Sequence, residues 1–210
     1  MTTSDSTERF SSRVADYVRF RPDYPPALLE WLHGPMDVSH QARVADIGAG
    51  TGISSRQFLA SGHPLVAVEP NAAMRAAAEE WLAPQYAGFS AVDGRAEATG
   101  LDDASIDLVS VAQAFHWFDR DAAAAEIART LVPHGTLGLL WNRADPACDW
   151  DLACHRVAHP AVGADDDTSA SATDLPGFLL EIHEEVRWTE RITREDYLRR
   201  WGTVSSFLVA

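Results

Sequence analysis

The 210-residue sequence has no hydrophobic run that approaches the length of a membrane span and no segment rich in lysine and arginine. A transmembrane helix needs about 20 apolar residues in succession, so we expect no membrane partner. The formal net charge is −14. Such a surface repels the phosphate backbone, so we expect no nucleic-acid partner. Two cysteines and the lack of a signal-like segment predict a cytoplasmic protein with reduced thiols.

Apolar runs and helical patterns alternate through the middle of the chain. Near-continuous apolar runs predict buried strands at 43–47, 64–69, 88–92, 105–113 and 136–142. Amphipathic segments predict helices at 27–33, 52–62, 71–82 and 119–131, with Asn71 placed to cap the third of them. Strands of this kind are typical of a parallel sheet covered on both faces. We therefore expect an α/β fold with a doubly wound, mainly parallel, Rossmann-like sheet.

The alternation stops after residue 142. The pattern predicts a helix at 148–160, a loop at 164–173, one long strand at 179–192 and a last helix from residue 194. Ahead of the first strand, a helix is expected up to Phe20, and a proline-rich strap follows it at 19–26. Cys154, His155 and His159 lie close in sequence, but no third ligand has a fitting spacing, so we expect no metal site.

A glycine-rich loop, "VADIGAGTG" at 44–52, follows the first predicted strand. Gly48, Gly50 and Gly52 alternate, and glycines after a strand favour close approach of the backbone to a ligand. The dinucleotide fingerprint G-x-G-x-x-G would need its third glycine at Ile53. Asp46 would repel a phosphate and attract an ammonium group. The loop therefore favours a cationic ligand over a pyrophosphate.

The second predicted strand ends in Glu69, about twenty residues after the loop begins. An acid at that place can accept hydrogen bonds from ribose hydroxyls. The predicted site therefore takes a ribose and a positive charge and has no need of a phosphate. S-adenosylmethionine has a ribose, an ammonium group and a sulfonium, and it has no phosphate.

Four segments in order, "VADIGAGTG", "VAVEPN", "DGRAEATGL" and "IDLVSVAQAFHWFD", resemble those of class I S-adenosylmethionine-dependent methyltransferases. The "AFHWFD" block and the leading "RFRPDYP" are similar to the small-molecule subgroup called methyltransferase type 11. The resemblance implies a seven-stranded sheet with one antiparallel edge strand, and here the last strand or strands are expected to be missing. It divides the chain into a helical lid or strap at 1–40, an S-adenosylmethionine-binding core at 41–142, and a substrate-side insertion with an incomplete C-terminal part at 143–210.

The resemblance also implies roles for individual residues. The expected cofactor-binding residues are Asp46, Gly48, Ala49, Gly50, Gly52, Glu69, Pro70, Asp93, Gly94, Arg95, Ala96, Gln113, Ala114 and Phe115. Two alternatives stay open: Asp46 also suits the start of the following helix, and Arg95 also suits the surface.

The expected substrate-side residues are Tyr17, Arg21, Tyr24, His116, Trp117, Trp141 and Asn142. Arg21 suits a carboxylate on the cofactor or on the substrate. His116 is the candidate general base, because the ordinary pKa of histidine lies near neutrality, and the alternative is a residue that only shapes the wall. The strap tyrosines suit core packing equally well.

These features predict an enzyme that moves a methyl group from S-adenosylmethionine to a small molecule by direct in-line displacement, with S-adenosylhomocysteine as product. An oxygen acceptor is favoured over nitrogen or carbon. The alternatives are a nucleotide-fold binding protein without turnover and an NAD-dependent oxidoreductase. We expect a monomer or a homodimer.

Overall fold

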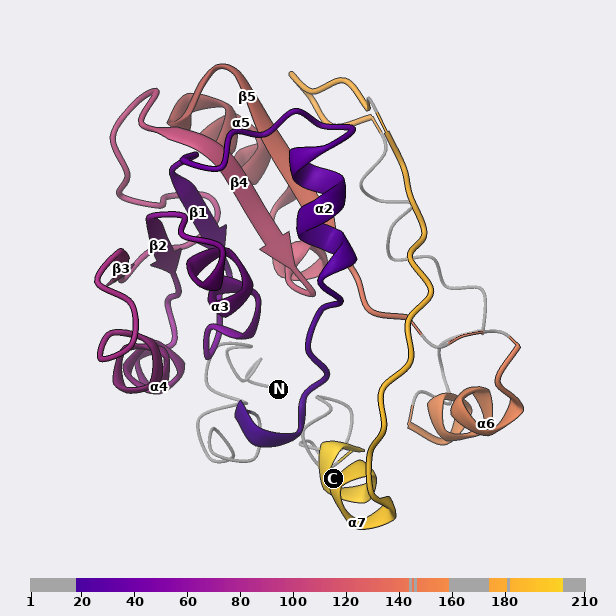
Figure 1. Cartoon of the computed structure of the whole chain (residues 1–210). Helices are drawn as coiled ribbons and strands as arrows, with labels where there is room; N and C mark the ends of the chain where they lie inside the picture. The colour runs from indigo at the N-terminus through magenta and orange to yellow at the C-terminus, as the bar shows by residue number, and fades with distance from the viewer. Residues whose placement is uncertain (1–17, 144, 146, 159–173, 181, 202–210) are drawn as a thin grey trace, which may run out of the picture.

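The computed structural model describes residues 18–143, 145, 147–158, 174–180 and 182–201. Its centre is a sheet of five strands, all paired in parallel, in the order β3-β2-β1-β4-β5 (Figure 1). The strands are β1 (Val44–Ile47), β2 (Leu65–Val68), β3 (Phe89–Val92), β4 (Ile106–Ala112) and β5 (Leu131–Leu140). The predicted α/β fold with a doubly wound parallel sheet is therefore confirmed.

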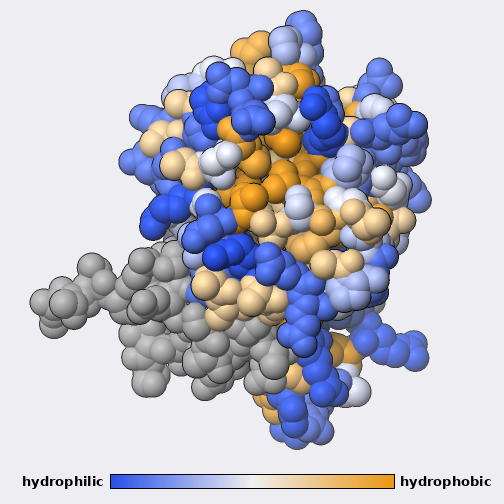
Figure 2. Space-filling model, turned by 90° about the vertical axis from the view of Figure 1, so that its left-hand side faces the viewer, coloured by the Kyte–Doolittle hydropathy of each residue, from blue (hydrophilic) through white to orange (hydrophobic). Residues whose placement is uncertain are grey.

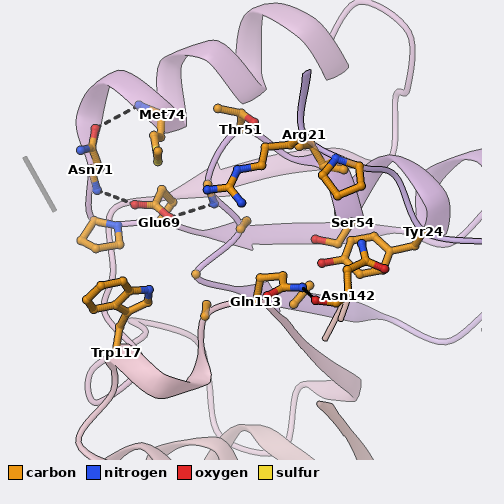
Figure 3. A pocket seen from close by; sticks show the side chains of 18 of the residues that line it. Arg21, Tyr24, Thr51, Ser54, Glu69, Asn71, Met74, Gln113, Trp117 and Asn142 are labelled. Atoms are coloured by element: carbon orange, nitrogen blue, oxygen red, sulfur yellow. Dashed lines mark hydrogen bonds between the residues drawn. The ribbon is translucent and has the colours of Figure 1, made fainter. Parts of the chain in front are cut away.

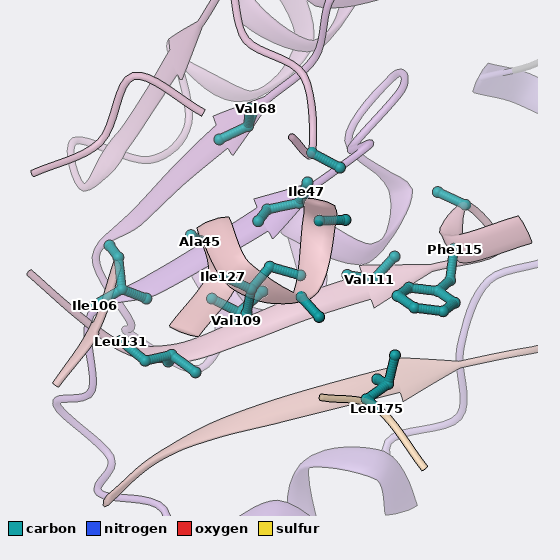
Figure 4. Packing of buried hydrophobic residues seen from close by; sticks show 14 residues of the cluster. Ala45, Ile47, Val68, Ile106, Val109, Val111, Phe115, Ile127, Leu131 and Leu175 are labelled. Atoms are coloured by element: carbon teal, nitrogen blue, oxygen red, sulfur yellow. The ribbon is translucent and has the colours of Figure 1, made fainter. Parts of the chain in front are cut away.

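Helices cover both faces of the sheet. On one face, α2 (Ala27–His33), α3 (Ile53–Ala60) and α4 (Ala72–Leu82) contribute to a core with Val44 of β1. On the other face, α5 (Arg120–Thr130) packs through Ile127 on Ala45, Val109 and Val111 (Figure 4). Successive strand residues point to opposite faces, so a strand buried on both sides shows the continuous apolar run that predicted it.

The strand order reverses between β1 and β4. The chain moves outward from β1 through β2 to β3, and then returns to the other side of β1 as β4. In open α/β sheets, ligands bind at the carboxyl ends of the strands at such a reversal. The glycine loop follows β1 and Gln113 follows β4, so the fold brings two predicted segments to this place.

The edge strand β3 is only half-buried. No helix forms in the connection from β3 to β4, at 93–105, so less protein covers the sheet there. Figure 2 looks onto the side of the molecule that carries β3 and shows apolar residues gathered at its centre, with polar residues around them. Val66, Val92 and Leu101 are half-buried against the core beneath.

The other edge strand, β5, begins at Leu131, earlier than the predicted start at residue 136. Its register against β4 shifts between Ile106 and Leu108, and His134 has a φ of 65°. The strand therefore includes Pro133, whereas the preceding helix ends at Thr130, close to its predicted end at residue 131. An edge strand tolerates a proline, because the missing N–H need not face a second neighbour.

Beyond β5, α6 (Asp149–Ala158) and α7 (Arg194–Trp201) lie where helices were expected. The strand predicted at 179–192 is wrong, because its described residues form an extended trace without strand pairing (Figure 1). Leu179 is 91% exposed. The alternating pattern was present, but a strand exists only where a neighbour supplies backbone partners. Within the described ranges the sheet has neither a sixth strand nor an antiparallel edge strand.

Two further predictions concern the N-terminal helix and membrane-spanning segments. Residues 18–20 are helical, and the rest of the predicted first helix, with Tyr17, lies outside the described residues. None of the helices in the described ranges is both long enough and apolar enough to span a bilayer.

Candidate functional site

A pocket opens at the carboxyl ends of β1, β2 and β4, under the strap that precedes α2 (Figure 3). It brings together many of the predicted residues: Arg21, Tyr24, Gly48, Ala49, Gly50, Glu69, Pro70, Gln113, Ala114, Trp117 and Asn142. These residues come from five separate stretches of the chain. The pocket is therefore a candidate binding site built by the strand reversal.

The three glycines of the loop differ in what surrounds them. All have a positive φ: 71° at Gly48, 58° at Gly50 and 84° at Gly52. A Cβ on Gly48 would lie 2.7 Å from that of Ala114, and one on Gly52 would lie 2.5 Å from Leu82 Cδ1. Gly52 packs on α4 and does not line the pocket. A Cβ on Gly50 would meet only Met74 Sδ, at 3.8 Å, so Gly50 leaves room for a ligand.

Glu69 connects the glycine loop to the start of α4. Its carboxylate accepts a hydrogen bond from Gly50 N and another from Asn71 N, both at 2.8 Å. The residue is buried, and burial raises the pKa of Glu69 while these two N–H donors oppose the rise. Each carboxylate oxygen keeps a lone pair beyond the backbone bond. Glu69 can therefore still accept hydrogen bonds from ligand hydroxyls.

Asp46 lies behind the pocket and does not line it. Its Oδ2 accepts hydrogen bonds from Ser54 Oγ and Ser55 Oγ, each at 2.6 Å, at the start of α3. Burial raises the pKa of Asp46, and the serine hydrogen bonds oppose that effect. The structure thus shows Asp46 hydrogen-bonded to two side chains in the first turn of α3. Contact with a ligand ammonium group stays a prediction.

Gln113, at the end of β4, has a φ of 56°, a strained conformation for a residue other than glycine. Its backbone N–H donates to Leu140 O and its Nε2 donates to Asn142 O, both at 2.9 Å. These bonds hold the turn that carries Gln113 and Ala114 into the pocket lining. Strained residues cluster at functional sites, which supports the choice of this pocket.

The aromatic block after β4 forms a short 3-10 helix, Phe115–Trp117. Trp117 lines the pocket. Phe115 instead packs in the core, at 68° to the ring of Phe118. His116 lies outside the lining, with its ring 4.8 Å from that of Trp117. Desolvation lowers the pKa of His116, so its neutral form is favoured.

The strap crosses the pocket and is held by polar contacts at Asp23. The Asp23 carboxylate accepts a hydrogen bond from Gln57 Nε2 at 2.7 Å and pairs with Arg56 of α3. Asn142 Nδ2 donates to the Asp23 carbonyl at 3.2 Å. These contacts position Arg21 and Tyr24 over the site. Trp141, next to Asn142, packs against the core and does not line the pocket.

The residues after β3 lie away from the pocket lining. Asp93 is exposed and pairs with Arg75, with 3.4 Å between Oδ2 and Nη2. Arg95 is exposed, as the surface alternative expected, and Ala96 is buried in the core. A Cβ on Gly94 would lie 2.5 Å from Thr99 O, so this glycine serves backbone packing. Their predicted contact with an adenine ring stays a prediction.

Sequence reasoning missed several lining residues: Pro22, Thr51, Ile53, Ser54, Asn71, Met74, Ala112 and Phe118. Most of them directly neighbour predicted residues. Asn71 was predicted only as a cap, and its side chain does accept hydrogen bonds from Ala73 N and Met74 N. Met74 follows one helical turn later, and helical spacing from the cap could have identified it. In the described part of the chain, no three His, Cys, Asp or Glu side chains form a group that could hold a metal.

Comparison with known proteins places this chain among the methyltransferases. A sequence profile of the methyltransferase domain matches residues 45–139. An uncharacterized methyltransferase of Mycobacterium tuberculosis is 38% identical over 190 residues, which are 90% of this chain and 73% of that protein. One from Schizosaccharomyces pombe is 33% identical, covering 94% of this chain and 78% of its own length.

A solved structure agrees with this comparison. A protein from Anaeromyxobacter dehalogenans assigned as a type II methyltransferase has a TM-score of 0.63 and 27% identity, and the match covers 89% of this chain and 80% of that one. The family assignment argues against the alternative of an NAD-dependent oxidoreductase. The chain is an enzyme that belongs to the class I S-adenosylmethionine-dependent methyltransferases.

Proposed function

We propose that this enzyme binds S-adenosylmethionine in the pocket under the strap and transfers its methyl group to a small molecule. The observation that carries the proposal is Glu69, a buried carboxylate tied to Gly50 N that lines the pocket. This acid suits the two hydroxyls of a ribose and repels a phosphate. Gly50 leaves open space beside it. The residues therefore fit the family's cofactor.

When bound, S-adenosylmethionine supplies an electrophilic methyl group on a positively charged sulfur. Glu69 would orient the ribose, and Arg21 suits the carboxylate of the amino-acid end. Trp117 and Phe118 present aromatic faces, which favour a cationic sulfur. In this proposal, the strap residues Arg21, Pro22 and Tyr24 would shield the reacting groups from water. The chain's contribution is thus alignment in a dry pocket, which suits direct in-line transfer.

The acceptor that we propose is a small molecule, methylated on oxygen in preference to nitrogen or carbon. The strap and Asn142 close one side of the pocket, which supports a compact acceptor. The net charge of −14 disfavours a nucleic acid. His116 is the candidate base for a hydroxyl acceptor, because its exposed ring lies 4.8 Å from that of Trp117, which lines the pocket, and the direction of its pKa shift favours the neutral ring that accepts a proton. It acts in this proposal from the rim beside Trp117.

The cofactor proposal is tested by calorimetry with S-adenosylmethionine, S-adenosylhomocysteine and NAD. We expect the two adenosyl compounds to bind and NAD to bind weakly. At about 100 times the dissociation constant, a bound ligand adds roughly 2.7 kcal/mol of stability, a rise in Tm of about 5–10 °C. Binding of NAD alone would refute the proposal.

A pair of glycine variants provides the matched control. Gly50 and Gly62 both have a positive φ, and a Cβ on Gly62 would meet nothing within 4 Å. Gly50→Val and Gly62→Val therefore introduce similar backbone strain, but only the first places atoms in the pocket. We expect only Gly50→Val to abolish binding.

The acceptor is tested by assaying methyl transfer with labelled cofactor and panels of carboxylic acids, phenols and amines. A preference for amines would contradict the proposed oxygen acceptor.

A further inference from the structure

Three histidines meet at the amino ends of β1 and β2, the opposite ends of these strands from the pocket. His33 ends α2, His40 lies in the loop before β1, and His63 lies in the turn before β2. The rings of His33 and His40 stack with their centroids 3.8 Å apart. Nε2 of His63 lies 3.3 Å from Nε2 of His33. None of the three lines the pocket, so the cluster needs an explanation of its own.

The positions of the ring hydrogens follow from the neighbouring carbonyl groups. Nδ1 of His33 lies 2.9 Å from Val38 O, and Nδ1 of His63 lies 3.0 Å from Ala42 O. A carbonyl oxygen can only accept a hydrogen bond, so each Nδ1 carries a hydrogen. A neutral imidazole has one N–H, so two neutral rings would turn unprotonated Nε2 atoms towards each other. A hydrogen bond between these two atoms therefore requires one added proton.

The surroundings of the two rings place that proton on His33. His63 is 2% exposed, and burial lowers its pKa, an effect that a backbone hydrogen bond opposes and that the nearby His33 and His40 increase. His33 is only partly buried and lies in the last turn of α2, where the helix carbonyls favour positive charge. The acids nearest to His33 along the chain, Glu30 and Asp37, are exposed, and neither forms an ion pair with a histidine of the described ranges.

We propose that His33 and His63 share one added proton, with the His33 imidazolium donating from its Nε2 to Nε2 of neutral His63. This hydrogen bond joins the end of α2 to the turn before β2, and α2 directly follows the strap. A second proton would turn two N–H groups towards each other, and loss of the shared proton would leave two opposed lone pairs. The junction therefore holds α2 most firmly at an intermediate pH.

The unfolded chain fixes the pH at which this maximum falls. Its histidines have an ordinary pKa near 6.5, so the two rings hold two protons well below that pH and none well above it. The folded pair holds one proton through this range. The pair's contribution to stability therefore rises with pH below about 6.5 and falls with pH above it. Above about pH 7.5, this pair should raise the unfolding equilibrium constant by up to about tenfold per pH unit.

The direct test is nitrogen NMR of the histidine rings in the wild-type protein at about pH 7.5, where an ordinary histidine is mostly neutral. EDTA is included so that no metal ion takes the place of the proton. Ring nitrogen shifts distinguish imidazole from imidazolium, and the signals are assigned by correlation to the backbone. We expect an imidazolium at His33 and a neutral His63 protonated at Nδ1. Two neutral rings in the pair would overturn the inference, and so would an imidazolium at His63.

His33→Gln provides the second test, because an amide N–H can donate to His63 without a titrating proton. The measurement is urea unfolding of the free protein as a function of pH. Above about pH 7.5, the ratio of the wild-type to the variant unfolding constant should rise by up to about tenfold per pH unit. The control is His183→Gln, which removes an exposed histidine outside the cluster and should give a constant ratio. A constant ratio for His33→Gln would contradict the shared proton. If that variant does not fold, the wild-type NMR decides alone.

Discussion

Replacing Glu69 with glutamine should separate the glycine loop from α4. The carboxylate accepts one hydrogen bond from Gly50 N and one from Asn71 N, each at 2.8 Å. A glutamine has one carbonyl oxygen, so its NH₂ group must face one of the two N–H donors. That donor loses its partner in a buried place. Glu69→Gln therefore tests whether this side chain holds the site together.

The expected cost follows from these contacts. A hydrogen bond to a charged group contributes about 1.5–3 kcal/mol. Glutamine removes one such bond, but it also removes the burial penalty that raises the pKa of Glu69. The two effects oppose each other, and we expect a net loss of about 2 kcal/mol in the free energy of unfolding. For a domain of this size, that loss lowers Tm by roughly 4–8 °C.

The assay is urea unfolding of the free protein, followed by calorimetry with S-adenosylhomocysteine. Glu80→Gln makes the same chemical change on an exposed position of α4 and serves as the control. We expect the control to match the wild type in both measurements. A loss below about 0.5 kcal/mol for Glu69→Gln, which is the range of ordinary surface substitutions, would refute the reasoning.

Further substitutions test the surrounding structure. Gly94→Ala places a Cβ 2.5 Å from Thr99 O, and we expect urea unfolding to show a loss of about 1–3 kcal/mol from overpacking. The pKa of Glu126 lies at about 2, below its ordinary 4.5, chiefly because Arg129 donates to it. The contribution of ionised Glu126 to the free energy of unfolding is present above pH 4.5 and is lost as the pH falls towards 2. In Glu126→Gln, the free energy of unfolding measured by urea should therefore fall less between pH 4.5 and 2 than in the wild type. Asp23→Ala removes the carboxylate that attaches the strap to Gln57 and Arg56 of α3. The pair with Arg56 is partly exposed and contributes at most about 1 kcal/mol, so Tm should change little while proteolysis within the strap accelerates. Unchanged cleavage there would contradict the conclusion that Asp23 holds the strap in place.

The sequence predicted the centre of the site because its signals are local. Glycines at alternate positions after β1 and an acid at the end of β2 lie within short stretches, and Gly48, Gly50 and Glu69 do line the pocket. The cap at Asn71 was also predicted and is confirmed. Phe115 shows the limit, because it neighbours pocket residues but turns into the core. Adjacent residues in a turn point in different directions, and sequence proximity does not say which.

The C-terminal segment shows a second limit. Alternation at 179–192 predicted a strand, and the described residues there form none. Periodicity describes the faces that a segment would present, whereas pairing depends on a free neighbour with matching register. The same distinction explains β5, which extends through Pro133 because it occupies an edge.

The amino-acid sequence by itself determined the alternating order of strands and helices, the glycine loop, and hence the family. Those features depend on residue type and on spacing along a few turns of chain. Only the tertiary structure decided that Glu69 binds the backbone of Gly50, 19 residues earlier. It also decided that Asp46 serves the start of α3 and that the Thr51 hydroxyl is buried without a partner. Hydrogen bonding and burial depend on contacts between distant segments, and periodicity carries no information about them.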